Sequence, residues 1–210
     1  LLQDDSKRIM QRAEWPVAGG ETQYGLGLAI LDVAGHRLVG HGGGFPGHIT
    51  RSVVDVEQRL AISVLTNAID GAAQTYAHGA VHLLHLAATA EPDPVAPPGA
   101  LARCTGRFAS VWGVFDLVVL GGRLFQLDPS HDDPAAFPIR LDYVDDDTLR
   151  FSRAPGPTSP GYASPGELLR FTRRPDGTIA SLRAGSSCTA LPFDDFVASI
   201  AARSAITLPD

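Results

Sequence analysis

The chain has 210 residues, of which 44% are hydrophobic and 19% are charged, and its formal net charge is −6 at pH 7. This balance excludes an intrinsically disordered chain and a basic nucleic-acid-binding protein. No apolar run approaches the roughly 18–20 residues that a membrane-spanning helix needs, so no membrane span is predicted. The whole sequence holds one lysine, Lys7, and one asparagine, Asn67, and both scarcities limit its chemistry.

The first part of the chain is predicted to form an antiparallel meander. The sequence begins at Leu1 without a methionine or a signal-peptide pattern, so we expect this end to be a cut: a mature terminus, a proteolytic product or an expression fragment. A short helix is expected near residues 6–12. Four strand-like runs separated by turn residues follow, at 24–33, 37–41, 49–56 and 60–66. The first and last runs are apolar on both alternating faces, which is typical of strands covered on both sides.

A helix is expected next, over residues 70–88. Seven residues form its predicted apolar stripe: Ile69, Ala73, Tyr76, Ala80, Leu83, Leu84 and Ala87. This stripe can cover one face of the sheet, and nothing else in the sequence clearly covers the other. We therefore expect an incomplete domain over residues 1–90, with a homo-oligomer formed through the uncovered sheet face as one outcome.

The second part of the chain is predicted to be a small antiparallel β-barrel. Residues 91–100 carry four prolines and one glycine, which predicts a stiff, extended linker. Eight short strand-like runs separated by turn residues follow within 101–210, and a short helix at about 194–203 closes the chain. The predicted fold class is α+β: an antiparallel sheet with a C-terminal helix, followed by the barrel.

The two cysteines leave their redox state open. Cys104 and Cys188 occupy the first and last predicted barrel strands, which are neighbours in a closed barrel. A disulfide and a pair of free buried thiols are both compatible with this placement.

The densest motif is the glycine-rich segment from Gly40 to His48. Gly42-x-Gly44-x-x-Gly47 matches the spacing of a dinucleotide-binding loop, but Pro46 and the β-type run after it deny the helix that such a loop requires. His41 to Gly44 also match the oxyanion loop of α/β-hydrolases, but no Gly-x-Ser-x-Gly elbow occurs in the chain. An ordinary tight connection between two strands is a further interpretation.

A family resemblance accounts for this segment better. Three segments, Tyr24-Gly25-Leu26-Gly27-Leu28, Gly40-His41-Gly42-Gly43-Gly44-Phe45-Pro46-Gly47 and Leu60-Ala-Ile-Ser-Val-Leu-Thr-Asn67, stand in this order. Together they resemble the C-terminal third of the serine β-lactamase-like family, which includes class C β-lactamases, penicillin-binding proteins, D-aminopeptidases and esterases. The resemblance covers about residues 1–90. More loosely, the second part resembles barrel domains appended to some D-aminopeptidase-type members.

The resemblance implies roles for the glycine-rich segment. His41-Gly42-Gly43 takes the place of the family's third motif, on the strand beside the substrate. His41 would orient substrate or assist proton transfer, and histidine carries less positive charge at neutral pH than the lysine of many members. Gly43 would let an acyl chain lie close to the strand, and the Gly44 N–H would donate to the oxyanion. The resemblance also implies that Gly42, Phe45 and His48 bind substrate. His48 would do so by packing at the rim of the site.

Two other motifs of the family are absent. In Ser-x-x-Lys a lysine acts as base for the acylated serine, but Asp4 stands three residues before the only lysine. Tyr-x-Asn needs an asparagine, but Leu65 stands two residues before Asn67. The sequence therefore predicts a C-terminal fragment of a serine hydrolase that is inactive alone. The full-length protein would hydrolyse a β-lactam, a D-amino-acid peptide or an ester through an acyl-enzyme.

No cofactor is predicted, and the resemblance implies export to the periplasm or the extracellular space. An alternative from another class is a non-catalytic β-barrel binding module that carries a degenerate β-lactamase remnant. The open reading frame upstream of Leu1 discriminates the two, since the enzyme requires Ser-x-x-Lys and then Tyr-x-Asn in it.

Three histidines of the predicted helix, His78, His82 and His85, have a spacing that can hold a metal ion. They lie opposite the predicted apolar stripe, beside polar residues, which favours a solvated polar face. No metal site is therefore predicted.

Overall fold

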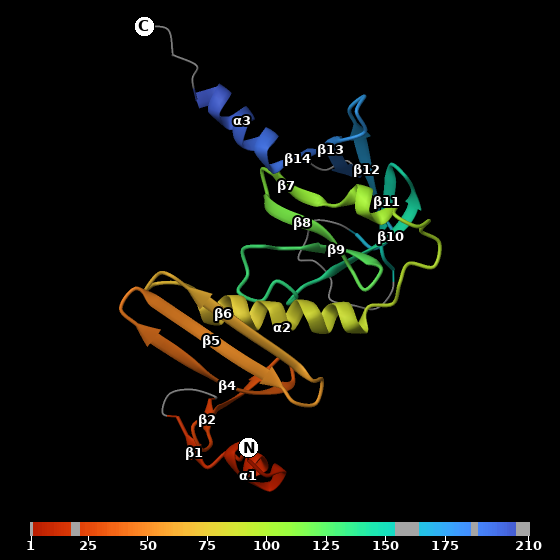
Figure 1. Cartoon of the computed structure of the whole chain (residues 1–210). Coiled ribbons are helices and arrows are strands. Elements are labelled where there is room, and N and C mark those ends of the chain that lie inside the picture. Colours follow the sequence, from red (N-terminus) through yellow and green to blue (C-terminus); the bar gives the residue numbers. More distant parts are fainter. Residues whose placement is uncertain (1, 18–21, 154–163, 186–188, 205–210) are drawn as a thin grey trace, which may run out of the picture. The chain divides into compact units, whose positions relative to one another are not determined.

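The computed structural model describes residues 2–17, 22–153, 164–185 and 189–204. The chain divides into two compact units, Leu1–Leu84 and His85–Asp210, and the division falls inside one continuous helix, α2 (Ala73–Thr89). Figure 1 shows a sheet together with α2, and a strand-rich barrel. The α+β class predicted from the sequence is confirmed.

The first unit is an antiparallel meander with neighbours in chain order. Its elements before α2 are α1 (Asp4–Met10), β1 (Trp15–Pro16), β2 (Gln23–Tyr24), β3 (Ala29–Val33), β4 (His36–Phe45), β5 (His48–Asp55) and β6 (Leu60–Thr66). The run predicted over 24–33 is broken into β2 and β3. The break falls at two glycines: a Cβ at Gly25 would lie 2.2 Å from the Met10 carbonyl oxygen, and Gly27 has a φ of +75°.

Helix α2 packs on one face of this sheet through its small side chains. Ala77 and Val81 form a buried cluster with Val33, Leu38 and Val53. The apolar stripe predicted from the sequence is wrong in part, because two of its members, Tyr76 and Leu84, are 62% and 45% exposed. The buried positions Ala73, Ala77 and Val81 stand four residues apart, so the helix comes close to the sheet along its narrowest row of side chains.

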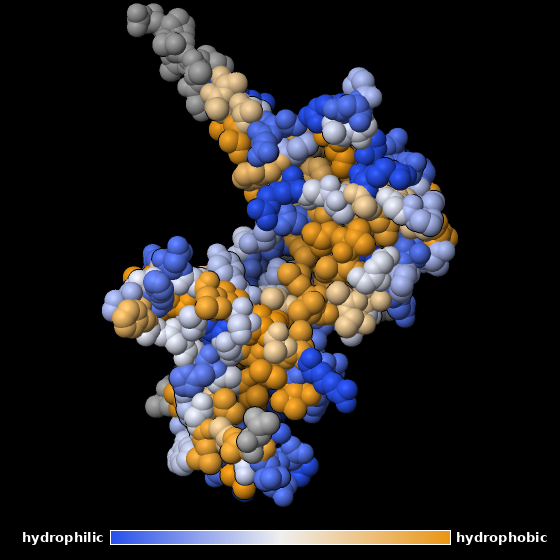
Figure 2. All heavy atoms as spheres, viewed as in Figure 1, coloured by the Kyte–Doolittle hydropathy of each residue, from blue (hydrophilic) through white to orange (hydrophobic). Residues whose placement is uncertain are grey.

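The opposite face of the sheet is covered over β3 and β4 and open over β5 and β6. Side chains alternate between faces along a strand, so Ile30, Val39, Val54 and Leu65 point away from α2. The first two are buried, whereas Val54 and Leu65 are 36% and 76% exposed. Figure 2 shows exposed apolar surface among hydrophilic areas. Self-association through the open part of this face stays a prediction.

The second unit contains the predicted eight-stranded closed barrel. Its strands are β7 (Gly106–Ser110), β8 (Gly113–Leu120), β9 (Arg123–Leu127), β10 (Ile139–Asp145), β11 (Thr148–Phe151), β12 (Leu168–Arg173), β13 (Ile179–Ala184) and β14 (Thr189–Pro192). A 3-10 turn, η1 (Leu101–Cys104), precedes them and α3 (Phe193–Ser204) follows. The first and last strands pair, with Ala109 opposite Leu191. Cys104 is buried, whereas Cys188 lies outside the described residues, so their pairing stays open.

The proline-rich segment 91–100 is anchored on the barrel. Asp93 accepts a hydrogen bond from the Tyr143 backbone N–H (2.8 Å), and its carboxylate lies 3.5 Å from the Arg123 guanidinium. Arg123 also donates to the Glu91 carbonyl (2.9 Å). The segment predicted as an extended linker is therefore held to the barrel by a largely buried ion pair. Across the part of the chain that the structure describes, no helix is long and apolar enough to cross a membrane.

Candidate active site

All six predicted site residues lie on the hairpin of β4 and β5. His41, Gly42, Gly43, Gly44 and Phe45 form the second half of β4, and His48 is the first residue of β5. The strands pair continuously from His41 opposite Ser52 to Phe45 opposite His48. Between them Gly47 has a φ of +83°, which glycine adopts readily at a tight turn. One hairpin thus brings the predicted residues together.

The second half of β4 extends beyond its neighbour β3. Pairing between these strands ends where Ala29 lies opposite Gly40. Among the described residues, the segment from His41 to Phe45 pairs with β5 alone. An edge of this kind presents backbone N–H and C=O groups that can pair with an extended chain or a backbone-like ligand.

Two of the four strand glycines have close neighbours and two do not. A Cβ at Gly40 would lie 2.0 Å from the Ser52 carbonyl oxygen, so glycine is needed there. At Gly43 a Cβ would lie 2.7 Å from the Thr50 hydroxyl oxygen, so the Thr50 side chain would have to shift. At Gly42 and Gly44 a Cβ would meet nothing closer than 3.5 Å. None of Gly42, Gly43 and Gly44 has a positive φ. Consecutive glycines have a low preference for the strand conformation, and they have no side chains to pack. The backbone of this segment is therefore not covered by side chains of its own.

The side chain of His41 is fixed at both ring nitrogens. Nδ1 contacts the Gly42 carbonyl oxygen, and Nε2 contacts the Tyr24 hydroxyl. A carbonyl oxygen can only accept, so in the neutral ring Nδ1 carries the proton and Nε2 accepts from the Tyr24 O–H. The rings of Tyr24 and His41 meet edge to face, with centroids 5.7 Å apart. Tyr24 lies in a segment that carries the family resemblance, but no spacing rule predicted its contact with His41.

Basic side chains lie on the α2 side of the same strands. Partial burial lowers the pKa of Arg51, and the nearby Tyr24 acts in the opposite direction. Burial also lowers the pKa of His78 on α2, and the charges of Arg51 and His82 lower it further. Within the described chain, the Arg51 Nε and His78 Nε2 atoms are buried without a hydrogen-bond partner.

A serine nucleophile paired with a lysine base is not found in this site. The only lysine, Lys7, is on α1, where its ammonium lies 2.7 Å from Asp4 on the surface. Ser52 stands opposite His41, but its hydroxyl bonds to that of Ser63 (2.8 Å). The hairpin therefore offers backbone donors and a histidine, and β2 adds the Tyr24 hydroxyl.

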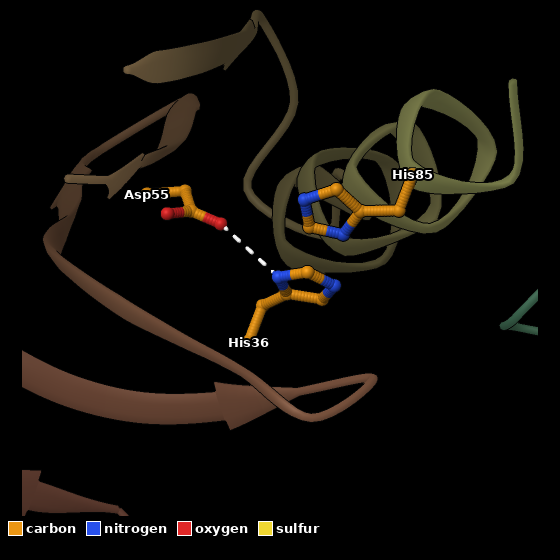
Figure 3. Close-up of side chains that lie close together, drawn as sticks. All are labelled: His36, Asp55 and His85. Carbon is orange, nitrogen blue, oxygen red and sulfur yellow. Dashed lines mark ion pairs between the residues drawn. The ribbon is translucent and has the colours of Figure 1, made fainter. Parts of the chain in front are cut away.

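The helix histidines differ from the prediction. His78, His82 and His85 are each partly buried rather than fully solvated, because α2 packs through a different face from the one predicted. Within the first unit, His36 Nδ1 lies 3.3 Å from Asp55 Oδ2. Figure 3 marks this ion pair with a dashed line. The separation of His36 and Asp55 in the sequence gave no signal for the pair.

No protein-family model and no curated protein matches this chain. Its structure is similar to that of an octameric penicillin-binding protein homologue from Pyrococcus abyssi, at 20% identity and a TM-score of 0.39, with 90% of this chain and 42% of that chain covered. It is also similar to SurE with D-Leu, at 22% identity and a TM-score of 0.33, with 90% and 44% covered. The chain thus spans less than half the length of these structures.

Proposed function

We propose that the first unit supplies one wall of an acyl-transfer active site of the serine β-lactamase-like kind. The acylated serine and its lysine base would lie in polypeptide outside this sequence, and this chain alone would be inactive. The observation that carries the proposal is the run from Gly42 to Gly44. These three glycines lie on an extended strand where none has a positive φ, and packing leaves room for a Cβ at Gly42 and Gly44.

The strand edge would hold the substrate's backbone-like amide or ester group. Gly43 points to the sheet face away from α2 and has no side chain, so an acyl chain can lie against it. The Gly44 N–H would donate to the developing oxyanion together with the nucleophile's own N–H. Removal of one donor of this kind typically slows a reaction by about 10²–10³-fold.

His41 and Tyr24 would act beside this edge. The Gly42 carbonyl and the Tyr24 hydroxyl orient the His41 ring, so its position is set before a ligand arrives. In that place the histidine can orient the substrate or assist a proton transfer. Phe45 and His48 pair at the hairpin tip, where they would line the rim of the site. The substrate is a small molecule or a peptide: a β-lactam, a D-amino-acid peptide or an ester.

A valine at position 43 tests this role of the strand. In the product of the complete reading frame, Gly43→Val places a branched side chain on the substrate side of β4. We expect acylation by a fluorophosphonate or a fluorescent penicillin to slow at least about tenfold, because misplacement of a substrate near the reacting atoms is costly.

The matched control for this variant is Ala61→Val, an exposed position of β6 on the same sheet face. It should acylate at the wild-type rate. Equal rates for the Gly43→Val variant and the wild type, with both proteins folded, would refute the role of β4.

A further inference from the structure

Two basic side chains of the first unit, Arg51 and His78, lie between β5 and α2. Arg51 is the fourth residue of β5, and His78 stands in the first half of α2. Both residues are partly buried. Their Nε and Nε2 atoms are fully buried, and within the described residues neither atom has a hydrogen-bond partner. Buried polar groups in folded proteins normally have one, so the two orphaned nitrogens call for an explanation.

Strand register and helix packing bring the two side chains together. Arg51 stands two residues before Val53 on β5, so both side chains point to the same face of the sheet. Val53 packs against Ala77 of α2, and His78 directly follows Ala77. Burial lowers the pKa of His78, and the charge of Arg51 lowers it further, so the two groups are near neighbours.

The neighbours of Arg51 supply no negative charge. Its cross-strand neighbours are Gly42 of β4 and Val64 of β6. Across the part of the chain that the structure describes, no carboxylate pairs with this guanidinium. The barrel shows the paired arrangement: Arg107 lies opposite Asp116, whose carboxylate oxygens accept from Arg107 Nε and Nη2 (2.7 and 2.8 Å). Arg51 has the same N–H groups in a partly buried place and lacks the anion, which is a costly arrangement for a charge.

The bare backbone of β4 gives the guanidinium an open side. A Cβ at Gly42 would lie 3.5 Å from Arg51 Nη1, so the guanidinium lies beside a residue that has no side chain. Pairing between β3 and β4 ends at Gly40, and no described strand continues the sheet beside Gly42. A ligand can therefore approach Arg51 from this edge of the sheet, on the α2 side.

We propose that Arg51 and His78 bind one oxyanion, a carboxylate or a phosphate group, for which inorganic phosphate is the probe. The Nε and Nη2 groups of an arginine form a fork that donates to two oxygens of such a group. His78 with a proton on Nε2 donates a third hydrogen bond from the helix. The anion would supply the charge that Arg51 lacks, so its binding stabilises the first unit. Gly43 points to the opposite sheet face, so the proposal is independent of the acyl-transfer site.

Anion titration of the 210-residue chain tests the site. In a buffer without phosphate or carboxylates, we expect saturable binding of one phosphate by titration calorimetry. Phosphate should also raise the Tm more than chloride does at equal ionic strength, and should shift the ring resonances of His78 in NMR spectra. A parallel titration with acetate shows which of the two groups binds more tightly, and saturable binding of either at this site supports the proposal.

The variants Arg51→Gln and His78→Gln should each weaken anion binding at least about tenfold, because each removes a donor to a charged group. Arg51→Lys should weaken it as well, since it keeps the charge and loses the fork. Circular dichroism checks that each variant is folded, and a folding defect in one leaves the others to carry the test.

The matched control is Arg59→Gln, which removes an exposed arginine from the turn between β5 and β6 of the same unit. It should bind phosphate as tightly as the wild type. Absence of saturable binding of both phosphate and acetate by the folded wild type would overturn the proposal. So would binding that Arg51→Gln and His78→Gln both retain, or a loss in Arg59→Gln as large as in Arg51→Gln, because either result places the anion elsewhere.

Discussion

His78 is a residue whose charged form the fold disfavours. Burial lowers its pKa from the ordinary 6.5, and the charges of Arg51 and His82 act in the same direction. The unfolded chain therefore takes up this proton at a higher pH than the folded chain does. Below pH 6.5 the unfolded state binds more protons, so this residue makes stability rise with pH and fall on acidification.

Replacement of this histidine tests that sign. His78→Gln should reduce the loss of stability that the wild type shows as the pH falls below about 6.5. The urea midpoint of the first unit, measured at a series of pH values, reports the effect. His48→Gln, at an exposed position in the same unit, serves as control and should keep the wild-type slope. A wild-type slope in the His78→Gln variant would contradict the assignment.

Some residues of the candidate site could be predicted from the sequence, and others could not. His41, the three glycines after it, Phe45 and His48 are neighbours in the sequence, so one motif predicted them together and one hairpin holds them. The contact of Tyr24 with His41 depends on how β2 and the end of β4 come together. The ion pair of His36 with Asp55 depends on the register of β4 and β5, which local spacing does not reveal.

The predicted strand over 37–41 is shorter than β4, which ends at Phe45. Glycine has a low preference for strands, so the sequence placed the end of this strand at His41. Pairing with β5 carries it on to Phe45, because a partner strand on one side supplies the hydrogen bonds that local preference does not. The extended length of β4 is what exposes the bare backbone of the site.

Two alanine variants separate the glycine that the fold needs from one that it does not. Gly40→Ala should destabilise the first unit by about 3 kcal/mol, because its Cβ would lie 2.0 Å from the Ser52 carbonyl oxygen. Gly42→Ala should change stability by less than about 1 kcal/mol, because nothing lies closer than 3.5 Å to its Cβ. Urea unfolding measures both, and equal losses in the two variants would show that β4 and β5 do not approach as described.

The barrel strands were predicted better than the packing face of α2, because their sequence patterns differ in kind. The barrel strands were predicted within a few residues, because alternating apolar positions between turn glycines specify half-buried strands and their hairpins. Gly121 and Gly122, for example, have φ values of +57° and +79° at the turn between β8 and β9. The packing face of α2 was predicted wrongly in part, since large apolar residues such as Tyr76 weigh more in a hydrophobic pattern than the alanines that pack.

At the scale of the whole molecule, the chain joins a six-stranded sheet unit, for which we propose a role as one wall of an acyl-transfer site, to a closed barrel. The barrel closes on itself and keeps the proline-rich segment through Asp93 and Arg123. The first unit, by contrast, leaves apolar side chains such as Leu65 open on the sheet face that also carries Gly43. The proposed nucleophile-bearing polypeptide would have to reach this face.

Site-resolved acylation tests the proposed function most directly. The 210-residue chain and the product of the complete reading frame are treated with a fluorophosphonate and a fluorescent penicillin, and the acylated residue is located by mass spectrometry. We predict no stoichiometric label on the 210-residue chain, and one label on the longer product, at a serine followed three residues later by lysine. A stoichiometric label on any serine of the 210 residues, or a complete reading frame without such a serine, would contradict the account.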